Sequence, residues 1–263
     1  MNYDLQKAGM WKRAAAWMFD GILLGILAVA FAFVLSGLLG YDGYSDAVDR
    51  AYAEYETEYG VVFEITQEEY LAMTDTQRQN YDAAYQALTA DEDAMYAYNM
   101  VLNLTLIVTT VGILLAFLFW EFLIPLLLGN GQTLGKKIFG LGLIRNDGVR
   151  LNALQLFTRT VLGKYTVETM IPVYILLMIF WGTMGLAGTV ILLVILVVQI
   201  LSLAMTRTHS AIHDLMAGTV VVDIASQMIF HSTDELIAFQ KQLHAERVFR
   251  TKSEKERIQV RRA

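Results

Sequence analysis

Apolar residues are concentrated in four long blocks, and the chain between the blocks is polar or mixed. A helix that crosses a bilayer needs about 20 residues, and every block meets this length. Only a short stretch separates the last two blocks, which together are too long for one span, so we expect a tight hairpin there. The pattern predicts an all-α membrane protein built as a bundle of four transmembrane helices. The blocks cover residues 14–40, 100–128, 160–182 and 184–205.

The segment between the first two blocks is polar and has its own helical signals. Thr66 with Glu69, and Thr74 with Gln77, have the spacing of capping boxes, in which an N-cap side chain and the residue three positions later exchange hydrogen bonds. Residues 41–99 contain fourteen Asp and Glu and two Arg, a net charge of −12. We expect a helical acidic insertion outside the membrane. It is either a vestibule that attracts cations, a cap that binds a partner, or a solvated surface.

Two β-prone stretches flank the later spans. Residues 138–145 are followed by Asn-Asp-Gly, a tight-turn sequence, and residues 218–223 form a second strand-like run. We expect the two to pair as a small cytoplasmic β element. The predicted organisation is an N-terminus with the first span (1–40), the acidic insertion (41–99), a membrane core (100–223) and a basic helical tail (224–263).

The distribution of charge predicts the orientation of the chain. The protein is 56% hydrophobic and 17% charged, and its basic residues cluster near the N-terminus, between the second and third spans, and in the tail. Basic loops stay cytoplasmic. With four spans, all basic segments fall on one side and the acidic insertion on the other. We therefore expect a multi-pass protein of the cell (inner) membrane with both termini in the cytoplasm.

Three carboxylates interrupt the apolar blocks, namely Asp20, Glu121 and Glu168. An ionised side chain inside a bilayer costs several kcal/mol unless it is paired, hydrated or bound to an ion. The two prolines of the chain, Pro125 and Pro172, each follow one of the glutamates by four positions. A helical proline cannot bond to the carbonyl four residues back. Each glutamate is thus expected to present a freed backbone oxygen beside its carboxylate.

When residues are counted from the predicted cytoplasmic end of each span, Asp20, Glu121 and Glu168 lie at similar depths in the membrane. Gln199 in the fourth block lies at a similar depth. We expect all four in the inner third of the membrane. Basic residues that enter from the same side, Arg159 and Lys164, are the natural counter-ions. Lys164 and Glu168 are four positions apart, which makes them neighbours on an α-helix.

Several motifs together resemble the RDD family of prokaryotic membrane proteins. They are Ala-Gly-Met-Trp-Lys-Arg at 8–13 followed by Asp20, Gly-Gln-Thr-Leu-Gly-Lys-Lys-Ile-Phe-Gly-Leu at 131–141, Arg159 at the third span, and His-Asp-Leu-Met-Ala-Gly-Thr-Val-Val-Val from residue 213. The resemblance covers residues 8–40 and 100–223. It implies a bacterial or archaeal source and a short helix bundle, with Arg13, Asp20 and Asp214 as the name residues. Some members of the family have been connected with cation/proton antiport. The long acidic insertion departs from the family pattern.

Two interpretations of the intramembrane charges remain open. In the first, Asp20, Glu121, Glu168 and Gln199 bind a monovalent cation or a proton in a small coupled transporter, supported by Arg13, Arg159, Lys164 and Asp214. In the second, the charges are a structural salt-bridge cluster, with Asp20 and Glu168 paired to the basic residues. The protein is then a non-transporting scaffold that binds another protein, or a second copy of itself, through its acidic cap or basic tail.

Other functions find no support in the chain. No nucleophile and base are arranged for catalysis, so we expect no enzyme, and no cofactor motif or nucleic-acid partner is indicated. His209 and His213 are spaced for a shared metal, but a catalytic zinc needs three protein ligands. We therefore expect no resident metal.

Overall fold

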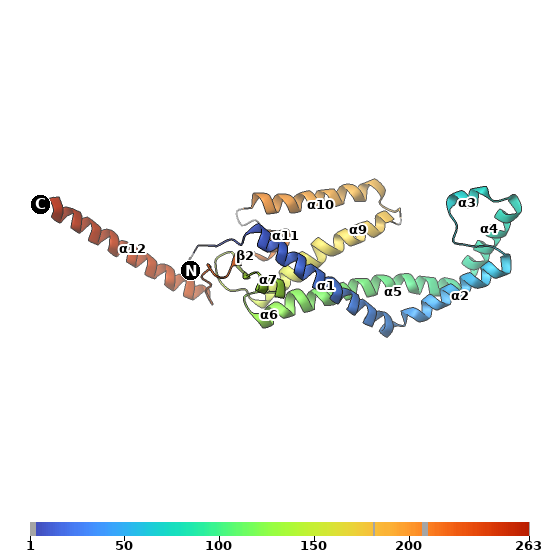
Figure 1. Ribbon diagram of the computed structural model, residues 1–263, viewed down its shortest axis with the longest axis horizontal. Coiled ribbons are helices and arrows are strands. Elements are labelled where there is room, and N and C mark those ends of the chain that lie inside the picture. The colour runs from blue at the N-terminus through green and yellow to red at the C-terminus, as the bar shows by residue number, and fades with distance from the viewer. Residues whose placement is uncertain (1–3, 181, 207–209, 263) are drawn as a thin grey trace. The chain divides into compact units, whose positions relative to one another are not determined.

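The computed structural model describes residues 4–180, 182–206 and 210–262, with side chains described up to residue 251. In the described part, four helices are long and apolar enough to cross a membrane (Figure 1), as the sequence predicts. The first is α1 (Met10–Leu39) and the fourth is α10 (Gly185–Met205). The second runs from Glu92 to Leu128 through α5 (Glu92–Phe117), η1 (Leu118–Leu123) and α6 (Ile124–Leu128). The third runs from Ala153 to Phe180 through α8 (Ala153–Phe157), η2 (Thr158–Met170) and α9 (Ile171–Phe180).

The predicted hairpin between the last two spans is present. Helix α10 packs along α9, and Figure 1 shows the two side by side. A Cβ atom at Gly188 would lie 2.7 Å from the side chain of Ile179, so glycine permits the close approach. The turn closes with the amide of Gly182 donating to the carbonyl of Ile179 at 2.9 Å.

Both spans that contain a proline are π-helical just before it. Stretch η1 ends two residues before Pro125, and η2 ends two residues before Pro172. A π-helix bonds each amide to the carbonyl five residues back, and such stretches are often found at functional sites. A proline forces a local change in the bonding ladder because it has no amide hydrogen. Sequence patterns alone did not predict these π-helical stretches.

The chain forms two compact units, one of residues 26–116 and the other of residues 1–25 with 117–263. The division falls within α1 and within the second span, rather than at the expected boundaries near residues 40 and 100. In the first unit, which we call the outer unit, the two long helices meet at Gly112, where an added Cβ atom would lie 3.2 Å from the backbone nitrogen of Ala32.

Short polar helices complete the outer unit, namely α2 (Tyr41–Tyr59), α3 (Gln67–Ala72) and α4 (Asp75–Ala90). Both predicted capping boxes are present at the starts of α3 and α4. Helix α2 packs on α4, and Phe63 in the loop after α2 makes edge-to-face contacts with Tyr52 of α2 and Tyr81 of α4, at ring-centroid distances of 5.4 and 5.8 Å. The acidic insertion is therefore an ordered helical cap.

The second unit, which we call the core unit, contains a small sheet. Strands β1 (Leu141–Arg145) and β2 (Thr219–Asp223) pair antiparallel, with Leu143 opposite Val221, as the sequence predicts. The first strand is shorter than expected, because residues up to Ile138 belong to α7 (Leu134–Ile138) and Gly140 turns the chain with a φ of 68°. Helix α11 (Ile212–Ala217) precedes β2 and packs against η2.

The tail is helical, as the sequence predicts. Helix α12 (Thr233–Arg262) is anchored near its start, where Leu236 packs with Val149 and Phe230. Most of the basic side chains of the tail lie beyond residue 251, outside the described side chains.

Candidate functional site

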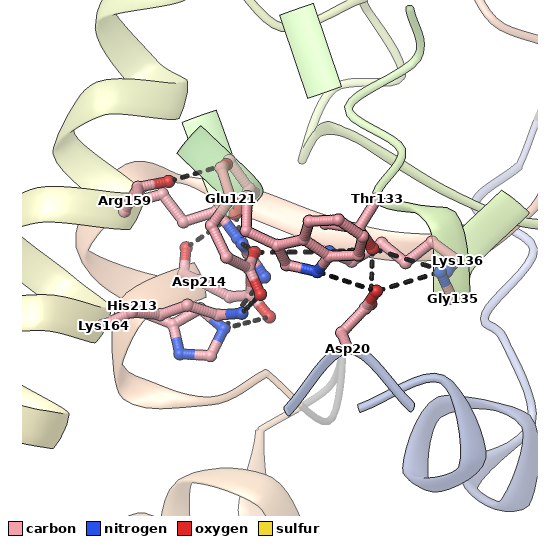
Figure 2. A network of polar contacts seen from close by, with 12 residues as sticks. Asp20, Glu121, Thr133, Gly135, Lys136, Arg159, Lys164, His213 and Asp214 are labelled. Carbon is pink, nitrogen blue, oxygen red and sulfur yellow. Dashed lines mark hydrogen bonds and ion pairs between the residues drawn. The ribbon is translucent and has the colours of Figure 1, made fainter. Parts of the chain in front are cut away.

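A continuous network of polar side chains occupies the core unit (Figure 2). Its residues come from α1, η1, α7, η2, α11 and α10. It contains as many carboxylates as basic side chains, so that with a neutral His213 its formal charges cancel. The carboxylates are Asp20, Glu121, Glu168 and Asp214, and the basic residues are Arg13, Lys136, Arg159 and Lys164.

Asp20 is held by hydrogen-bond donors. Its side chain is buried on the same face of α1 as Ala16. One oxygen accepts from the hydroxyl of Thr133 at 2.5 Å, and the other accepts from the amide of Gly135 at 2.9 Å and from the indole of Trp120 at 3.2 Å. No described basic side chain forms an ion pair with Asp20, so the expected salt bridge to Arg13, Arg159 or Lys164 is wrong.

The bonds that Thr133 and Gly135 make to Asp20 explain why these residue types occur in the Gly-Gln-Thr-Leu-Gly-Lys motif. Thr133 caps α7 by accepting from the amide of Lys136, while its hydroxyl hydrogen goes to Asp20. A Cβ atom at Gly135 would lie 2.7 Å from the backbone oxygen of Ala16 and 2.8 Å from the carboxyl carbon of Asp20. Glycine is thus needed for α7 to reach α1. The motif docks the segment between the second and third spans onto the buried carboxylate.

Glu121 lies at the centre of three basic side chains. Lys164 forms a close hydrogen-bonded ion pair with one carboxylate oxygen, and Lys136 and Arg159 each lie 3.6 Å from the other oxygen. A separation of 3.6 Å is too long for a hydrogen bond, so these two contacts are purely electrostatic. Glu121 is 4% exposed, and Lys136 and Arg159 are also buried. The charge of this carboxylate is therefore balanced by neighbouring basic side chains, although its Oε2 and one guanidinium nitrogen of Arg159 accept or donate no hydrogen bond among the described residues.

The backbone carbonyl of Glu121 is also engaged. The hydroxyl of Thr160 on η2 donates to it at 3.0 Å. This is the carbonyl four residues before Pro125, which the proline cannot use. The sequence predicted the free oxygen, and the structure shows that a side chain from the third span takes it. The contact ties the second and third spans together beside the carboxylate.

Arg159 joins Glu121 to Asp214. Its Nε donates to Asp214 at 2.8 Å, and the hydroxyl of Thr219 donates to the same oxygen at 2.9 Å. Arg13 of α1 approaches the other oxygen of Asp214 at 4.0 Å. The three name residues of the family resemblance thus meet in one network, in which Arg159 is the closest basic partner of Asp214.

His213 is held in one tautomer by its neighbours. A guanidinium NH₂ of Arg159 lies 3.0 Å from its Nε2, and both oxygens of Glu168 lie within 2.8 Å of its Nδ1. Because arginine only donates and carboxylate only accepts, Nε2 must be the acceptor and Nδ1 must carry the hydrogen. A Cβ atom at Gly163 would lie 2.5 Å from the Cβ atom of His213, so glycine lets α11 sit directly on η2.

Glu168 is positioned by His213 and by the fourth span. It accepts from the backbone amide of His213 at 3.0 Å and from the side-chain amide of Gln199 at 3.4 Å. The expected pairing of Lys164 with Glu168 is wrong, because Lys164 makes its ion pair with Glu121. The π-helical register explains this, since residues five apart are neighbours there; Thr169 accordingly bonds to the carbonyl of Lys164.

The groups outside the spans have shifted pKa values. Burial lowers the pKa of Lys136 to about 8, although Glu121 opposes the shift. Burial also lowers the pKa of His213, against the opposing effect of Asp214, which keeps the imidazole neutral at pH 7. For Asp214, burial opposes ionisation, but Arg159 and His213 outweigh it and hold the pKa of the carboxyl well below its usual range.

The structure brings Asp20, Glu121, Glu168 and Gln199 into one network, with Arg13, Arg159, Lys164 and Asp214 as its other predicted members. Whether they bind an ion stays a prediction. Sequence reasoning did not identify Thr133, Lys136, Thr160 and His213 as parts of this site, although three of them lie in the motifs quoted above. The spacing of His209 and His213, from which no resident metal was expected, is not tested, because His209 lies outside the described residues.

Comparison with known proteins identifies the family. No curated protein and no solved structure matches the chain significantly. A model of the RDD family matches residues 7–218, which include Arg13, Asp20, Asp214 and the loop motif that docks onto Asp20. Because the match covers most of the chain and the described part has four apolar helices long enough to span a bilayer, this protein is a membrane protein of the RDD family.

Proposed function

We propose that this protein is a small proton-coupled transporter of the cell membrane, in which the buried network carries the coupling proton. The observation that supports this proposal most is the neutral His213, which bridges Glu168 and Arg159 inside a charge-balanced cluster. Histidine is the side chain whose unperturbed pKa is closest to neutral pH. A proton can be gained at Nε2 without breaking a covalent bond or moving the backbone.

Protonation of His213 would change its partners. With a hydrogen on Nε2, the ring would face the NH₂ donor of Arg159, and two donors repel. The nearest acceptor is the second oxygen of Asp214, 3.6 Å from Nε2. The charged groups around the ring are Glu168, Arg159 and Asp214, with Lys164 acting from farther away. One proton therefore removes the contact of His213 with Arg159 and strengthens its pairing with Glu168 and Asp214.

The geometry favours a proton over a metal cation as the coupling ion. Glu121 is surrounded by three basic side chains, and Asp20 accepts three hydrogen bonds. A cation would have to displace these protein partners before it could bind. A proton needs only one acceptor nitrogen, which His213 provides.

The charge distribution supports an orientation with both termini in the cytoplasm. Lys136, Lys137, Arg145 and Arg150 lie in the segment between the second and third spans, whereas residues 41–99 carry a net charge of −12. Short basic loops are retained on the cytoplasmic side. In this orientation the network lies toward the cytoplasmic ends of the helices, and its protons come from the cytoplasm.

A second candidate function is a scaffold that does not transport. The observation that favours it is that the network ties distant segments together, through Arg159 to Asp214, Thr160 to the second span, and Thr133 to α1. A network of this kind can have a purely structural role, in which it fixes the arrangement of the helices. The partner would then be another protein, or a second copy, bound through the acidic cap or the tail.

Proton flux in liposomes distinguishes the two functions. The purified protein is reconstituted with a pH-sensitive dye inside, and sodium, potassium or lithium gradients are imposed. We expect ion-driven proton flux for the native protein and for His231→Gln, an exposed histidine outside the network, and none for His213→Gln or Glu168→Gln. Every variant is checked for folding by its thermal transition in detergent.

Native flux no greater than that of empty liposomes would exclude the transporter. Flux that persists unchanged in a folded His213→Gln protein would exclude His213 as the proton carrier. Loss of folding in every network variant, together with absence of native flux, would favour the scaffold.

A further inference from the structure

The outer unit contains a cavity of about 130 Å³ at the junction of α2, α4 and α5. It lies wholly within residues 26–116 and is separate from the polar network. Three tyrosines and a set of small or apolar residues form its walls, which are Val48, Ala51, Tyr52, Tyr85, Leu88, Thr89, Ala94, Met95 and Tyr98.

The cavity combines a buried floor with exposed aromatic walls. Leu88 and Ala94 are buried, whereas Tyr52, Tyr85 and Tyr98 are 38%, 54% and 40% exposed. Because each helix contributes one tyrosine, the rings come from three sides of the cavity. Burial raises the pKa of Tyr52, and Tyr98 and Tyr85 raise it further, which means that the three phenol groups lie near one another.

The polar atoms of the lining do not form a site for a metal ion. The hydroxyl of Thr89 donates to the carbonyls of its own helix, to Tyr85 at 2.8 Å and to Gln86 at 3.1 Å. No carboxylate is among the residues that line the cavity. A hard cation such as sodium or calcium requires several oxygen ligands to replace its water. The cavity offers aromatic rings and apolar groups instead.

The charge around the cavity nevertheless favours a ligand that is a cation. Residues 41–99, which form the cap, carry fourteen carboxylates and two arginines. Both arginines are turned to other partners: Arg50 donates to the carbonyl of Asp46, and Arg78 donates to the carbonyls of Leu71 and Met73 and lies over the ring of Tyr70. The negative potential of the cap therefore attracts cations toward the cavity.

We propose that this cavity binds a small organic cation of the quaternary ammonium class. Such an ion is weakly hydrated, fits apolar walls and is attracted by the faces of aromatic rings, as in aromatic cages. Its positive charge is matched by the acidic cap, which distinguishes it from a neutral apolar ligand. The site does not depend on the proposed transport function, because it belongs to the outer unit alone.

Calorimetric titration of the full-length protein in detergent tests the site. The probe is choline, and its control is the alcohol in which a tert-butyl group replaces trimethylammonium, which has the same shape without the charge. We expect choline to bind and the neutral alcohol to bind at least five-fold more weakly. Absence of choline binding at millimolar concentration, or equal binding of the two molecules, would overturn the proposal.

Substitutions of one cavity tyrosine locate the binding. Tyr85→Leu removes the ring and should weaken choline binding about two- to five-fold, while Tyr85→Phe keeps the ring face and should bind as the native protein does. Tyr96→Leu is the matched control, because Tyr96 is similarly exposed but contacts Tyr44 and does not line the cavity. Ala51→Met fills the space and should abolish binding. Equal affinities for Tyr85→Leu and Tyr96→Leu, or unchanged binding to folded Ala51→Met, would show that choline binds elsewhere.

Discussion

The core unit and the outer unit use charge in opposite ways. In the core unit, carboxylates and basic side chains are buried together and their formal charges cancel, as around Glu121 and Arg159. In the outer unit, carboxylates outnumber basic residues by fourteen to two within residues 41–99 and almost all are exposed. There, capping boxes and ring contacts hold the helices in place.

This difference shows where each unit is vulnerable. A buried charge that loses its partner is left in a medium that cannot solvate it, so the core unit depends on the completeness of its network. An exposed charge is solvated by water and contributes little to the free energy of unfolding. We therefore expect single charge removals to be severe in one unit and mild in the other.

The largest expected effect is that of Arg159→Met. It removes the hydrogen-bonded basic partner of Asp214 and one of the three basic neighbours of Glu121, and we expect a loss of about 3–5 kcal/mol in the free energy of unfolding. Thermal unfolding in detergent measures it. The matched change in the cap, Arg50→Met, removes an exposed arginine and should change the stability by less than about 0.5 kcal/mol. Similar effects of the two substitutions would contradict the distinction between the units.

Two glycines allow the core unit and the outer unit to be compared by packing instead of by charge. Gly163→Ala would place a Cβ atom 2.5 Å from that of His213, and we expect overpacking to cost about 1–3 kcal/mol. At Gly43 of α2 an added Cβ atom meets nothing within 4 Å. Gly43→Ala should therefore stabilise the cap by up to about 1 kcal/mol, because alanine favours helix over glycine. Chemical denaturation of both variants measures the two signs, and a gain in stability for Gly163→Ala would contradict the tight packing of α11 on η2.

The cap should respond instead to the loss of its local hydrogen bonds. Thr74→Ala removes the side-chain half of the capping box at the start of α4, the hydroxyl that accepts from the amide of Gln77, and should cost about 1 kcal/mol. Thr89→Ala is the control, since its hydroxyl bonds only within its own helix and its loss should be nearly neutral. Amide hydrogen exchange should show that the amides that lose protection in Thr74→Ala lie in the cap. An equal increase in exchange around Asp20 would show that the two units unfold together.

The smallest effect is expected from pH. Burial lowers the pKa of His213, so the unfolded chain binds more protons than the folded one below the unfolded pKa of about 6.5. The stability of the core unit should therefore fall as the pH is lowered from 7.5 to 5.5. In His213→Asn, whose amide can donate in place of Nδ1, this dependence should disappear. The tail variant His244→Gln should retain it, and retention in His213→Asn would assign the dependence to another group.

Much of the fold could be predicted because its signals are local. Runs of about 20 apolar residues determine the spans, and the capping boxes at Thr66 and Thr74 mark the starts of α3 and α4. Pairing of β1 with β2 also followed from composition and turn residues. The π-helical stretches did not, because they arise from the bonding ladder rather than from a periodic pattern.

The candidate site could be predicted only in part. Glu121 and Glu168 were visible because a carboxylate in an apolar run is rare. Their partners were not, since Lys164 approaches Glu121 from 43 residues away and His213 approaches Glu168 from 45 residues away. Such contacts depend on the tertiary packing of η2 with its neighbours. The assumed α-helical spacing even gave Lys164 the wrong partner.

The cancellation of formal charge in the network determines how the network responds to the membrane voltage. An electrically neutral group of side chains can shift within the bilayer without performing net work against the transmembrane field. One added proton at His213 makes the group cationic, and a full elementary charge that crosses the membrane is worth about 2.3 kcal/mol per 100 mV. The same cluster is thus indifferent to voltage in one protonation state and driven by it in the other.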